Sequence, residues 1–510
     1  MSIKLKIFRL SLIALLISIQ ATSLFAQKAK PVAVTDKGEL EKLKLAVEAN
    51  PDSLGKHAAY IKAVGLANPA LVAQYDVWMK KYPKSAAVPY ALAKAYVDEE
   101  SPKAKPYLLK TVAIDPKYTE AWGGLWIDGE RWGDFKASRD YLAKAVASDP
   151  SNADYSFYYA SSFGAIDQDK WRDMSLAVAK KFPTSERGAQ ALYWLGERSM
   201  NTEDKLKYFE LLRNSYPPEK FNWSSSGMTA YFSILLGTDP QKAIALATTM
   251  QNNPKEAKLW ANLTVQAQTI ADGKKLLDQS KAEEALTLFN KVKLPKYYSF
   301  NKDLLLLKAQ TVAQMGHTQA AYDSVMNAFV KAPSPSFYKA LYAYGTKSGK
   351  SAAQVKTDIF RNLDATAQQA TPFTLKKYFG EGSTSLADYK GKVVLVTYWF
   401  PGCGPCRGEF PHFEDVVRQY KNKPLEYVGI NIFPDQNDYV IPFMKSSGYS
   451  FTPLEDYKGR VKGNMDNKNA APVNFLLDQN GRIIFSNFRI TEANEDDLKL
   501  MIDLLLGTQA

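Results

Sequence analysis

The chain has 510 residues, of which 46% are hydrophobic and 23% charged, a composition typical of globular protein with room for two or more domains. The formal net charge is +12, but residues 365–510 carry 16 Lys and Arg against 17 Asp and Glu, so the basic excess belongs to the first 364 residues. This excess is spread without runs of Lys or Arg, which argues against a nucleic-acid-binding protein.

The first 26 residues have the layout of a secretory signal peptide. Lys4, Lys6 and Arg9 precede the apolar run 10–19, and a small residue, Ala26, ends the segment. The run is too short to span a bilayer. We expect cleavage after Ala26 and a mature protein that is soluble and lies outside the cytoplasm, in the periplasm or an equivalent compartment.

Prolines recur at regular intervals between residues 36 and 350. The interval is 32 to 34 residues for the first six and 37 to 41 for the last three, at Pro51, Pro83, Pro116, Pro150, Pro183, Pro217, Pro254, Pro295 and Pro333. Such a period is typical of a solenoid of helical hairpins, and 34 residues is the tetratricopeptide length. Each proline follows a helix end that its ring cannot continue.

Residues 27–364 therefore resemble tetratricopeptide repeats. Trp122 and Leu125 precede Pro150 at the spacing of that repeat. Small and large residues four positions apart, as in its second helix, occur at Ala104 and Leu108, Ala285 and Phe289, and Ala321 and Val325. The resemblance implies an all-α domain with a surface for protein or peptide partners. Aromatic residues at 155–159 could line that surface, although packing of helix on helix is the simpler explanation.

The polar run 364–370 predicts a linker or helix end before a second domain, which we place at residues 365–510. Its predicted elements, in chain order, are strand 393–399, a helix after residue 404, strand 425–432, helix 440–447, strands 473–477 and 482–485 with a turn at Asn480-Gly481, and a last helix carrying Leu498, Met501, Ile502 and Leu505. This order predicts an α/β fold around a small sheet.

The motif Cys403-Gly404-Pro405-Cys406 lies between the first of these strands and its helix. A helix N-terminus presents unpaired N–H groups and a positive dipole end, and both stabilise a thiolate. Cys403 is then the nucleophile and Cys406 its resolving partner. We expect the pair to work as a redox-active disulfide.

Three other uses of the cysteine pair are less consistent with the sequence. A zinc site needs four ligands, and only His57, His317 and His412 could add to the two cysteines of the whole chain. Arg407 stands where a haem-attachment motif has histidine. A structural crosslink over two intervening residues would constrain the unfolded chain little.

The C-terminal part resembles the TlpA/ResA branch of the thioredoxin superfamily, through segments 371–375, 386–394, 403–411 and 471–481. The resemblance implies a thioredoxin-like fold and an extracytoplasmic thiol-disulfide oxidoreductase that reduces protein disulfides. No cofactor is implied, and electrons would come from a membrane thiol relay. Gly402 departs from the family pattern, which has a bulky aromatic residue before the first cysteine.

The resemblance also implies roles for single residues. Cys403 corresponds to the attacking cysteine and Cys406 to the buried resolving one. Glu409 corresponds to a buried carboxylate and is counted with the catalytic residues, although the residue alone would be interpreted as a solvated helix carboxylate. Pro472 corresponds to a cis-proline beside the disulfide. The residues expected to position the substrate are Ala471, Pro472, Trp399, Gly404 and Pro405.

Two alternative functions stay open. A thiol peroxidase is a relative of this fold, but its P-x3-T-x2-C signature requires proline at position 396 and threonine at position 400, where Val396 and Phe400 stand. A protein of another class would use the repeats as its working part, as a scaffold or recruiting module with an accessory redox domain.

Overall fold

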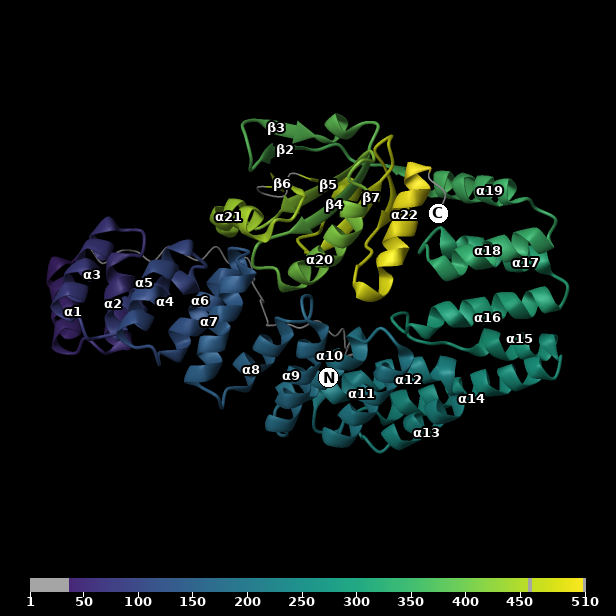
Figure 1. Ribbon diagram of the computed structural model, residues 1–510, viewed down its shortest axis with the longest axis horizontal. Helices are drawn as coiled ribbons and strands as arrows, with labels where there is room; N and C mark the ends of the chain where they lie inside the picture. Colours follow the sequence, from purple (N-terminus) through teal and green to yellow (C-terminus); the bar gives the residue numbers. More distant parts are fainter. Residues whose placement is uncertain (1–35, 457–460, 508–510) are drawn as a thin grey trace, which may run out of the picture.

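The computed structural model describes residues 36–456 and 461–507. Over these residues the chain forms a long series of helices followed by an α/β unit built on an eight-stranded sheet (Figure 1). The predicted fold class, an all-α helical-hairpin solenoid followed by an α/β domain, is confirmed. The expected signal peptide, residues 1–26, lies outside the described residues.

From residue 36 onward, nineteen α-helices precede the sheet domain, and successive helices pair as antiparallel hairpins. They are α1 (Lys37–Ala49), α2 (Leu54–Val64), α3 (Pro69–Lys81), α4 (Ala87–Asp98), α5 (Lys105–Ile114), α6 (Thr119–Arg131), α7 (Phe135–Ser148), α8 (Ala153–Ser161), α9 (Gln168–Lys181), α10 (Glu186–Arg198), α11 (Thr202–Ser215), α12 (Asn222–Thr238), α13 (Pro240–Met250), α14 (Ala257–Asp278), α15 (Ala282–Lys291), α16 (Phe300–Gln314), α17 (Thr318–Phe329), α18 (Pro335–Lys347) and α19 (Ala352–Thr366).

All nine periodic prolines lie in the connections between one hairpin and the next, from Pro51 between α1 and α2 to Pro333 between α17 and α18. The first two of the wider intervals have a simple cause, because α12 has 17 residues and α14 has 22. Short polar side chains start many helices. Asn152 before α8 and Asn201 before α11, for example, accept backbone N–H bonds from the first turn.

The sheet has the strand order β1-β8-β7-β4-β5-β6-β2-β3. Its strands are β1 (Gln368–Gln369), β2 (Thr374–Lys377), β3 (Ser383–Ser385), β4 (Val393–Trp399), β5 (Leu425–Asn431), β6 (Thr452–Glu455), β7 (Val473–Leu477) and β8 (Arg482–Ser486). The helices of this domain are α20 (Gly404–Gln419), α21 (Asn437–Ser447) and α22 (Glu495–Leu506). The central strand β4 is parallel to β5 and antiparallel to β7.

Strand β4 is buried on both faces, which explains its continuous apolar sequence. Leu395 and Trp399 belong to the core that also contains residues of α20, α21 and α22. Val396 and Tyr398 face the opposite core, which is closed by segments 370–389 and 461–465. This arrangement fixes the carboxyl end of β4, and hence the cysteine motif, in the middle of the domain.

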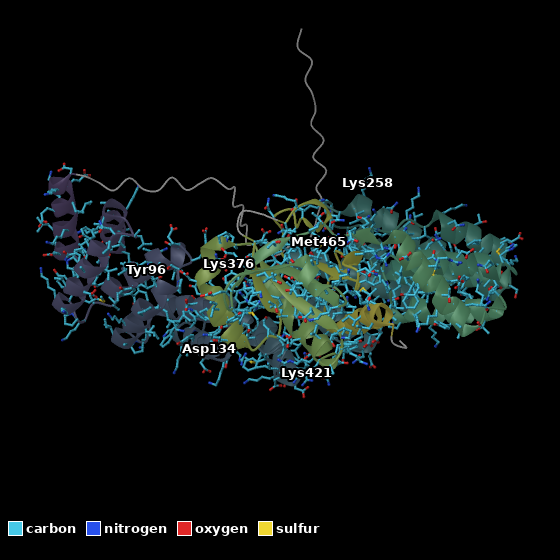
Figure 2. All side chains as sticks on the ribbon, turned by 90° about the horizontal axis from the view of Figure 1, so that it is seen from above. Tyr96, Asp134, Lys258, Lys376, Lys421 and Met465 are labelled. Atoms are coloured by element: carbon cyan, nitrogen blue, oxygen red, sulfur yellow. A yellow bond between two sulfur atoms is a disulfide. The ribbon has the colours of Figure 1, made fainter. Side chains whose placement is uncertain are left out.

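The helical region forms an arc, and the α/β domain sits within its concave side (Figure 1). Seen from above, the green to yellow domain lies over the middle of the arc (Figure 2). The end of the arc shares a core with this domain, since Val325 of α17, Leu341 of α18 and Ile502 of α22 belong to one buried cluster. The two parts are therefore packed together rather than joined only by the chain.

The structure differs from the sequence-based expectation in the short strands. Segment 364–370 was expected to be a linker or helix end, and it contains the end of α19 at Thr366 and the two residues of β1. Strands β2, β3 and β6 were not predicted, because runs of three or four residues carry too little periodicity. Among the described residues, no helix has the length and apolarity that a membrane crossing requires.

Candidate active site

The cysteine motif forms the junction between β4 and α20. Cys403 is the N-cap of α20, and its sulfur accepts a hydrogen bond from the backbone N–H of Cys406 at 3.2 Å. The two cysteines are joined by a disulfide with a Cα–Cα distance of 5.3 Å. The sulfur of Cys403 thus lies at the positive end of the helix dipole, where a thiolate would be stabilised after reduction.

The two cysteines differ in their surroundings. Cys406 has no exposed surface, and its sulfur lies 3.9 Å from the carbonyl oxygen of Tyr398. Cys403 is 2% exposed and adjoins Gly404 and Pro405, which are both exposed. The exposed Gly404-Pro405 edge is therefore the side from which another protein can approach the disulfide. This asymmetry suits an attacking role for Cys403 and a resolving role for Cys406, and both roles stay predictions.

Pro472 lies beside the motif because of the sheet register. Tyr398 of β4 pairs with Val473, the first residue of β7, so Pro472 stands next to the carboxyl end of β4. The Ala471-Pro472 peptide bond is cis, as the resemblance implied. Pro472 is buried and Ala471 is half-buried. Their expected part in positioning a substrate stays a prediction.

Trp399 was expected among the substrate-positioning residues, but it has no exposed surface. Its ring packs against Phe410, Phe443 and Phe451, at centroid distances of 5.5, 5.0 and 4.9 Å. In this conformation Trp399 supports the motif from within the core rather than from the surface.

Glu409 lies one helical turn after Cys406 and is only 6% exposed, so it is not a solvated helix carboxylate. Its Oε2 accepts a hydrogen bond from Asn474 Nδ2 at 2.9 Å, and its Oε1 lies 3.2 Å from Arg489 Nη1. Burial raises the pKa of Glu409, and the Asn474 hydrogen bond and the Arg489 charge oppose that rise. A buried carboxyl group whose pKa is raised can hold a proton and release it to a neighbouring group.

A second polar pair lies on the same face of the sheet. Thr397 of β4 and Asn474 of β7 are direct cross-strand partners, and neither has exposed surface. Within the described part of the chain, Thr397 Oγ1 and Asn474 Oδ1 have no hydrogen-bond partner. These two oxygens give Glu409 a polar environment on one side of an otherwise apolar core.

Several residues around the motif were missed in the sequence. Asn474 and Arg489 hold Glu409, and Asn474 could have been noticed as a polar residue inside an apolar strand. Arg407 Nη1 donates to the carbonyl oxygen of Pro401 at 3.0 Å. Gln436, which is 1% exposed, accepts from the backbone N–H of Gly402 at 2.6 Å. Gln436 carries no local sequence signal, because only the fold brings it to the motif.

Comparison with known proteins places the site in a family. Residues 366–486 match the model of the AhpC/TSA family. The thioredoxin-like protein YneN of Bacillus subtilis is 33% identical over 140 residues, which cover 27% of this chain and 78% of YneN. The thiol-disulfide oxidoreductase ResA of the same organism is 31% identical over 99 residues, which cover 19% of this chain and 54% of ResA.

Solved structures match the same part of the chain. The thioredoxin domain of a thiol-disulfide oxidoreductase from Bacteroides vulgatus is 27% identical, with a TM-score of 0.24, and the match covers 27% of this chain and 94% of that one. A thiol:disulfide interchange protein of Chlorobium tepidum is 23% identical, with a TM-score of 0.25 and coverages of 28% and 99%. On the identity and coverage shared with YneN and with the thiol-disulfide oxidoreductase ResA of Halalkalibacterium halodurans, which is 30% identical with 69% of its length covered, the chain belongs to the family of thioredoxin-like thiol-disulfide oxidoreductases.

Proposed function

We propose that the protein is an extracytoplasmic reductase of protein disulfides, that Cys403 and Cys406 are its redox pair, and that the helical region binds its partners. The observation that carries the proposal is the placement of the disulfide. Cys403 caps α20 beside the exposed Gly404-Pro405 edge, while Cys406 is buried in the first turn. A nucleophile at the accessible helix end and a sheltered resolving thiol are what a two-step thiol-disulfide exchange needs.

The reaction consumes the reduced enzyme. The Cys403 thiolate attacks one sulfur of the substrate disulfide, forms a mixed disulfide and displaces the other substrate sulfur as a thiolate. The Cys406 thiolate then attacks the sulfur of Cys403 and releases the second substrate thiolate. Two electrons pass to the substrate, both substrate sulfurs take up a proton, and the enzyme is left with its Cys403–Cys406 disulfide.

The proposed compartment has a consequence for the electron supply. The sequence pattern of residues 1–26 supports export to an oxidising compartment, where thiols are not kept reduced by the cytoplasmic systems. The oxidised enzyme therefore needs a donor of two electrons, and we propose a membrane thiol relay in that role. The donor must reach the same exposed edge as the substrate.

Cysteine substitution tests the roles of the two thiols. In Cys406→Ala the mixed disulfide cannot be resolved, so natural partners should accumulate on Cys403 in the periplasm and be identified by mass spectrometry. Cys403→Ala should accumulate few, because the remaining thiol has no exposed surface and lies inside the first turn of α20, behind the exposed Gly404-Pro405 edge. Equal trapping by the two variants would contradict the assignment. A separate assay of insulin reduction by the full wild-type chain tests whether the protein acts as a reductase.

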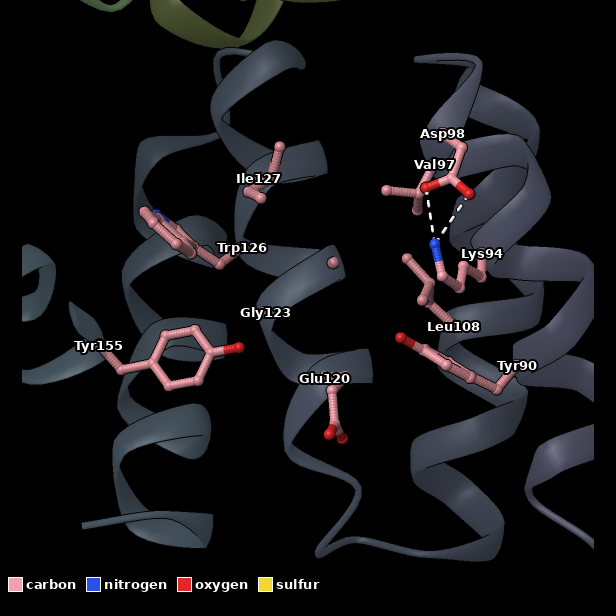
Figure 3. A pocket seen from close by; sticks show the side chains of 11 residues that line it. Tyr90, Lys94, Val97, Asp98, Leu108, Glu120, Gly123, Trp126, Ile127 and Tyr155 are labelled. Carbon is pink, nitrogen blue, oxygen red and sulfur yellow. Dashed lines mark hydrogen bonds and ion pairs between the residues drawn. The ribbon is translucent and has the colours of Figure 1, made fainter. Parts of the chain in front are cut away.

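A pocket on the helical region supports the proposed partner binding. It has a volume of about 210 Å³ and is lined by α4, α5, α6 and α8, with Tyr90, Trp126 and Tyr155 among its side chains (Figure 3). Its apolar lining is interrupted by Lys94, whose Nζ donates to the Asp98 carboxylate at 2.8 and 2.9 Å. Rigid aromatic surface next to a few polar groups is typical of sites that bind polypeptides.

The helices that line the pocket lead to the redox site in space, although they are distant from it in the sequence. It contains Val97 near the end of α4 and Ile127 one turn before the end of α6, and both helix ends meet the α/β domain. Ile127→Lys in the Cys406→Ala background should reduce the trapped partners. Val265→Lys changes an exposed residue of α14 in the same way and is the control. An unchanged set of adducts in Ile127→Lys would reject partner binding at this pocket.

A further inference from the structure

The helical region reaches the cysteine motif through two chains of contacts. The first begins at Gln436, whose side-chain oxygen holds the backbone N–H of Gly402, the residue before Cys403. The amide nitrogen of Gln436 donates to the carboxylate of Glu100, which follows α4. Glu100 in turn pairs with Arg131, the last residue of α6, at 3.0 Å.

The backbone of Glu100 adopts an unfavourable conformation at this contact. Its φ is +53°, a left-handed conformation that is uncommon for a residue other than glycine, asparagine or aspartate. Such a conformation is unfavourable by about 1 kcal/mol or more and persists where the surrounding structure fixes it. At Glu100 it coincides with a carboxylate that bridges Arg131 and Gln436.

The second chain of contacts ends on the residue after Cys406. Arg407 Nε lies 3.3 Å from Glu130 Oε2 of α6, and both side chains are about one-fifth exposed. The other oxygen of Glu130 accepts from Ser138 Oγ of α7 at 2.6 Å. Arg407 itself donates to the carbonyl oxygen of Pro401. The guanidinium is thus fixed between the helical region and the start of the motif.

Close packing keeps these contacts in register. Gly133, in the turn between α6 and α7, lies so near α21 that an added Cβ would come within 2.7 Å of the carbonyl oxygen of Phe443. The ring of Phe135 packs against Phe443 and Tyr449 at centroid distances of 6.1 and 6.3 Å. The α6–α7 hairpin is therefore seated directly on the α/β domain beside the motif.

We propose that the helical domain supplies part of the redox site: Glu130, through Arg407, and Glu100, through Gln436, are positioning residues that hold the two ends of segment 402–407 and set the thiol-disulfide equilibrium of Cys403 and Cys406. The inference rests on the thiol-disulfide chemistry of the pair and not on the direction of electron flow. It gives the helical region a role in the chemistry besides partner binding.

The expected effect follows from charge compensation. The guanidinium of Arg407 is held at the carbonyl oxygen of Pro401, two residues before Cys403. A positive charge near a thiolate stabilises it, and a more stable thiolate makes the disulfide a stronger oxidant. Glu130 neutralises the guanidinium of Arg407 and so keeps the pair reducing. Removing the carboxylate should favour the reduced form, whereas removing the guanidinium should favour the disulfide.

The test is the equilibrium of the full chain with glutathione, measured for Glu130→Gln, Arg407→Gln and the double variant. Glu130→Gln should shift the equilibrium about tenfold towards the dithiol, or about +30 mV. Arg407→Gln should shift it in the opposite direction, and the double variant should return close to wild type. The pKa of the Cys403 thiol, measured by the pH dependence of alkylation, should fall in Glu130→Gln and rise in Arg407→Gln.

Asp140→Asn is the matched control, because it also removes one carboxylate from the α6–α7 hairpin, but from an exposed pair with Lys136. Shifts of the same sign in Glu130→Gln and Arg407→Gln would show a merely structural contact and overturn the proposal. A Glu130→Gln equilibrium equal to that of Asp140→Asn would also overturn it. If Glu130→Gln fails to fold, the sign of the Arg407→Gln shift decides alone.

The Glu100 branch has its own readout. Glu100→Gln removes the charged acceptor of Gln436, so the Gly402 amide should exchange its hydrogen at least several-fold faster while amides of the distant α14 are unchanged. Equal exchange at Gly402 in wild type and variant would reject this branch. None of these measurements uses a protein substrate, so they remain decisive even if the protein does not reduce insulin.

Discussion

Glu409 shows how a single residue can be prepared for proton transfer. The carboxyl group belongs to the residue one helical turn after Cys406 and lies away from water, and burial raises its pKa. Asn474 and Arg489 hold it in place and limit the rise. The thiol of Cys406 must lose a proton before it resolves a mixed disulfide, and Glu409 is the buried titratable group next to it along α20.

We predict that Glu409→Gln slows turnover by about tenfold to a hundredfold, because general base assistance of this size is lost. The limb of the pH–rate profile that reports the carboxyl group should disappear. The rate of reduction of a small disulfide, measured from acid to neutral pH, checks both effects. A profile identical to wild type would show that Glu409 takes no part in proton transfer.

Arg489→Gln keeps the carboxyl group and removes a charge that lowers its pKa. The same limb of the pH–rate profile should therefore remain but move to higher pH. Because the side chain of Arg489 is 50% exposed, the shift should be modest. A shift to lower pH would contradict the proposed electrostatics of this site.

At the scale of elements, the sequence predicted what depends on local pattern. Strand 393–399 and strand 473–477 match β4 and β7, because short runs of mostly apolar, β-branched or aromatic residues indicate buried strands. The proline period located the connections between hairpins, because a proline ring cannot continue the preceding helix. The cysteine motif could be placed at a helix start because its dipeptide suits a first turn.

The remaining features could not be predicted, because they depend on contacts between distant segments. Gln436 and Glu100 are separated by 336 residues, and neither carries a pattern that points to the other. The burial of Glu409 also depends on β7 and on the segment after β8, which cover its side chain. Charged residues on a helix are ordinarily solvated, so only the fold or a family resemblance indicates otherwise.

The turn between α6 and α7 provides a test of how the two domains fit together. Gly133→Ala places a Cβ on a backbone with φ of +68° and against Phe443, so we expect a loss of about 2 to 4 kcal/mol in the free energy of unfolding. Gly316→Ala, in the turn between α16 and α17, has φ of +86° with open space around it and should lose only about 1 kcal/mol. Urea unfolding of both variants measures the difference. Equal losses would show that Gly133 is not pressed against α21.

At the scale of the whole molecule, a buried carboxylate makes the domain contact sensitive to pH. Asp128 of α6 is 3% exposed, and its Oδ1 accepts from Tyr439 of α21 at 3.1 Å and from Trp132 at 3.2 Å. Burial raises the pKa of Asp128 to about 6, against the attraction of Lys105. The charged form is therefore disfavoured in the folded protein.

The sign of the pH dependence follows from this raised pKa. The protonated form of Asp128 is favoured in the folded protein, and its contribution to the free energy of unfolding is complete below the ordinary pKa of aspartate, about 3.9. This contribution is lost as the pH rises through about 6. The loss is on the order of 2 to 3 kcal/mol for a shift of about two units. We expect wild type to lose stability over this range and Asp128→Asn to lose less, in chemical unfolding at a series of pH values. Parallel curves for the two proteins would contradict the raised pKa.

The proposed reductase requires a reducing dithiol. An equilibrium titration of the full chain against reduced and oxidised glutathione measures its potential directly. We predict a value near that of thioredoxin, about −270 mV, because the two proteins share the Gly-Pro dipeptide and because Glu130 compensates Arg407. A value above about −180 mV would identify an oxidant or isomerase and contradict the proposed reductase.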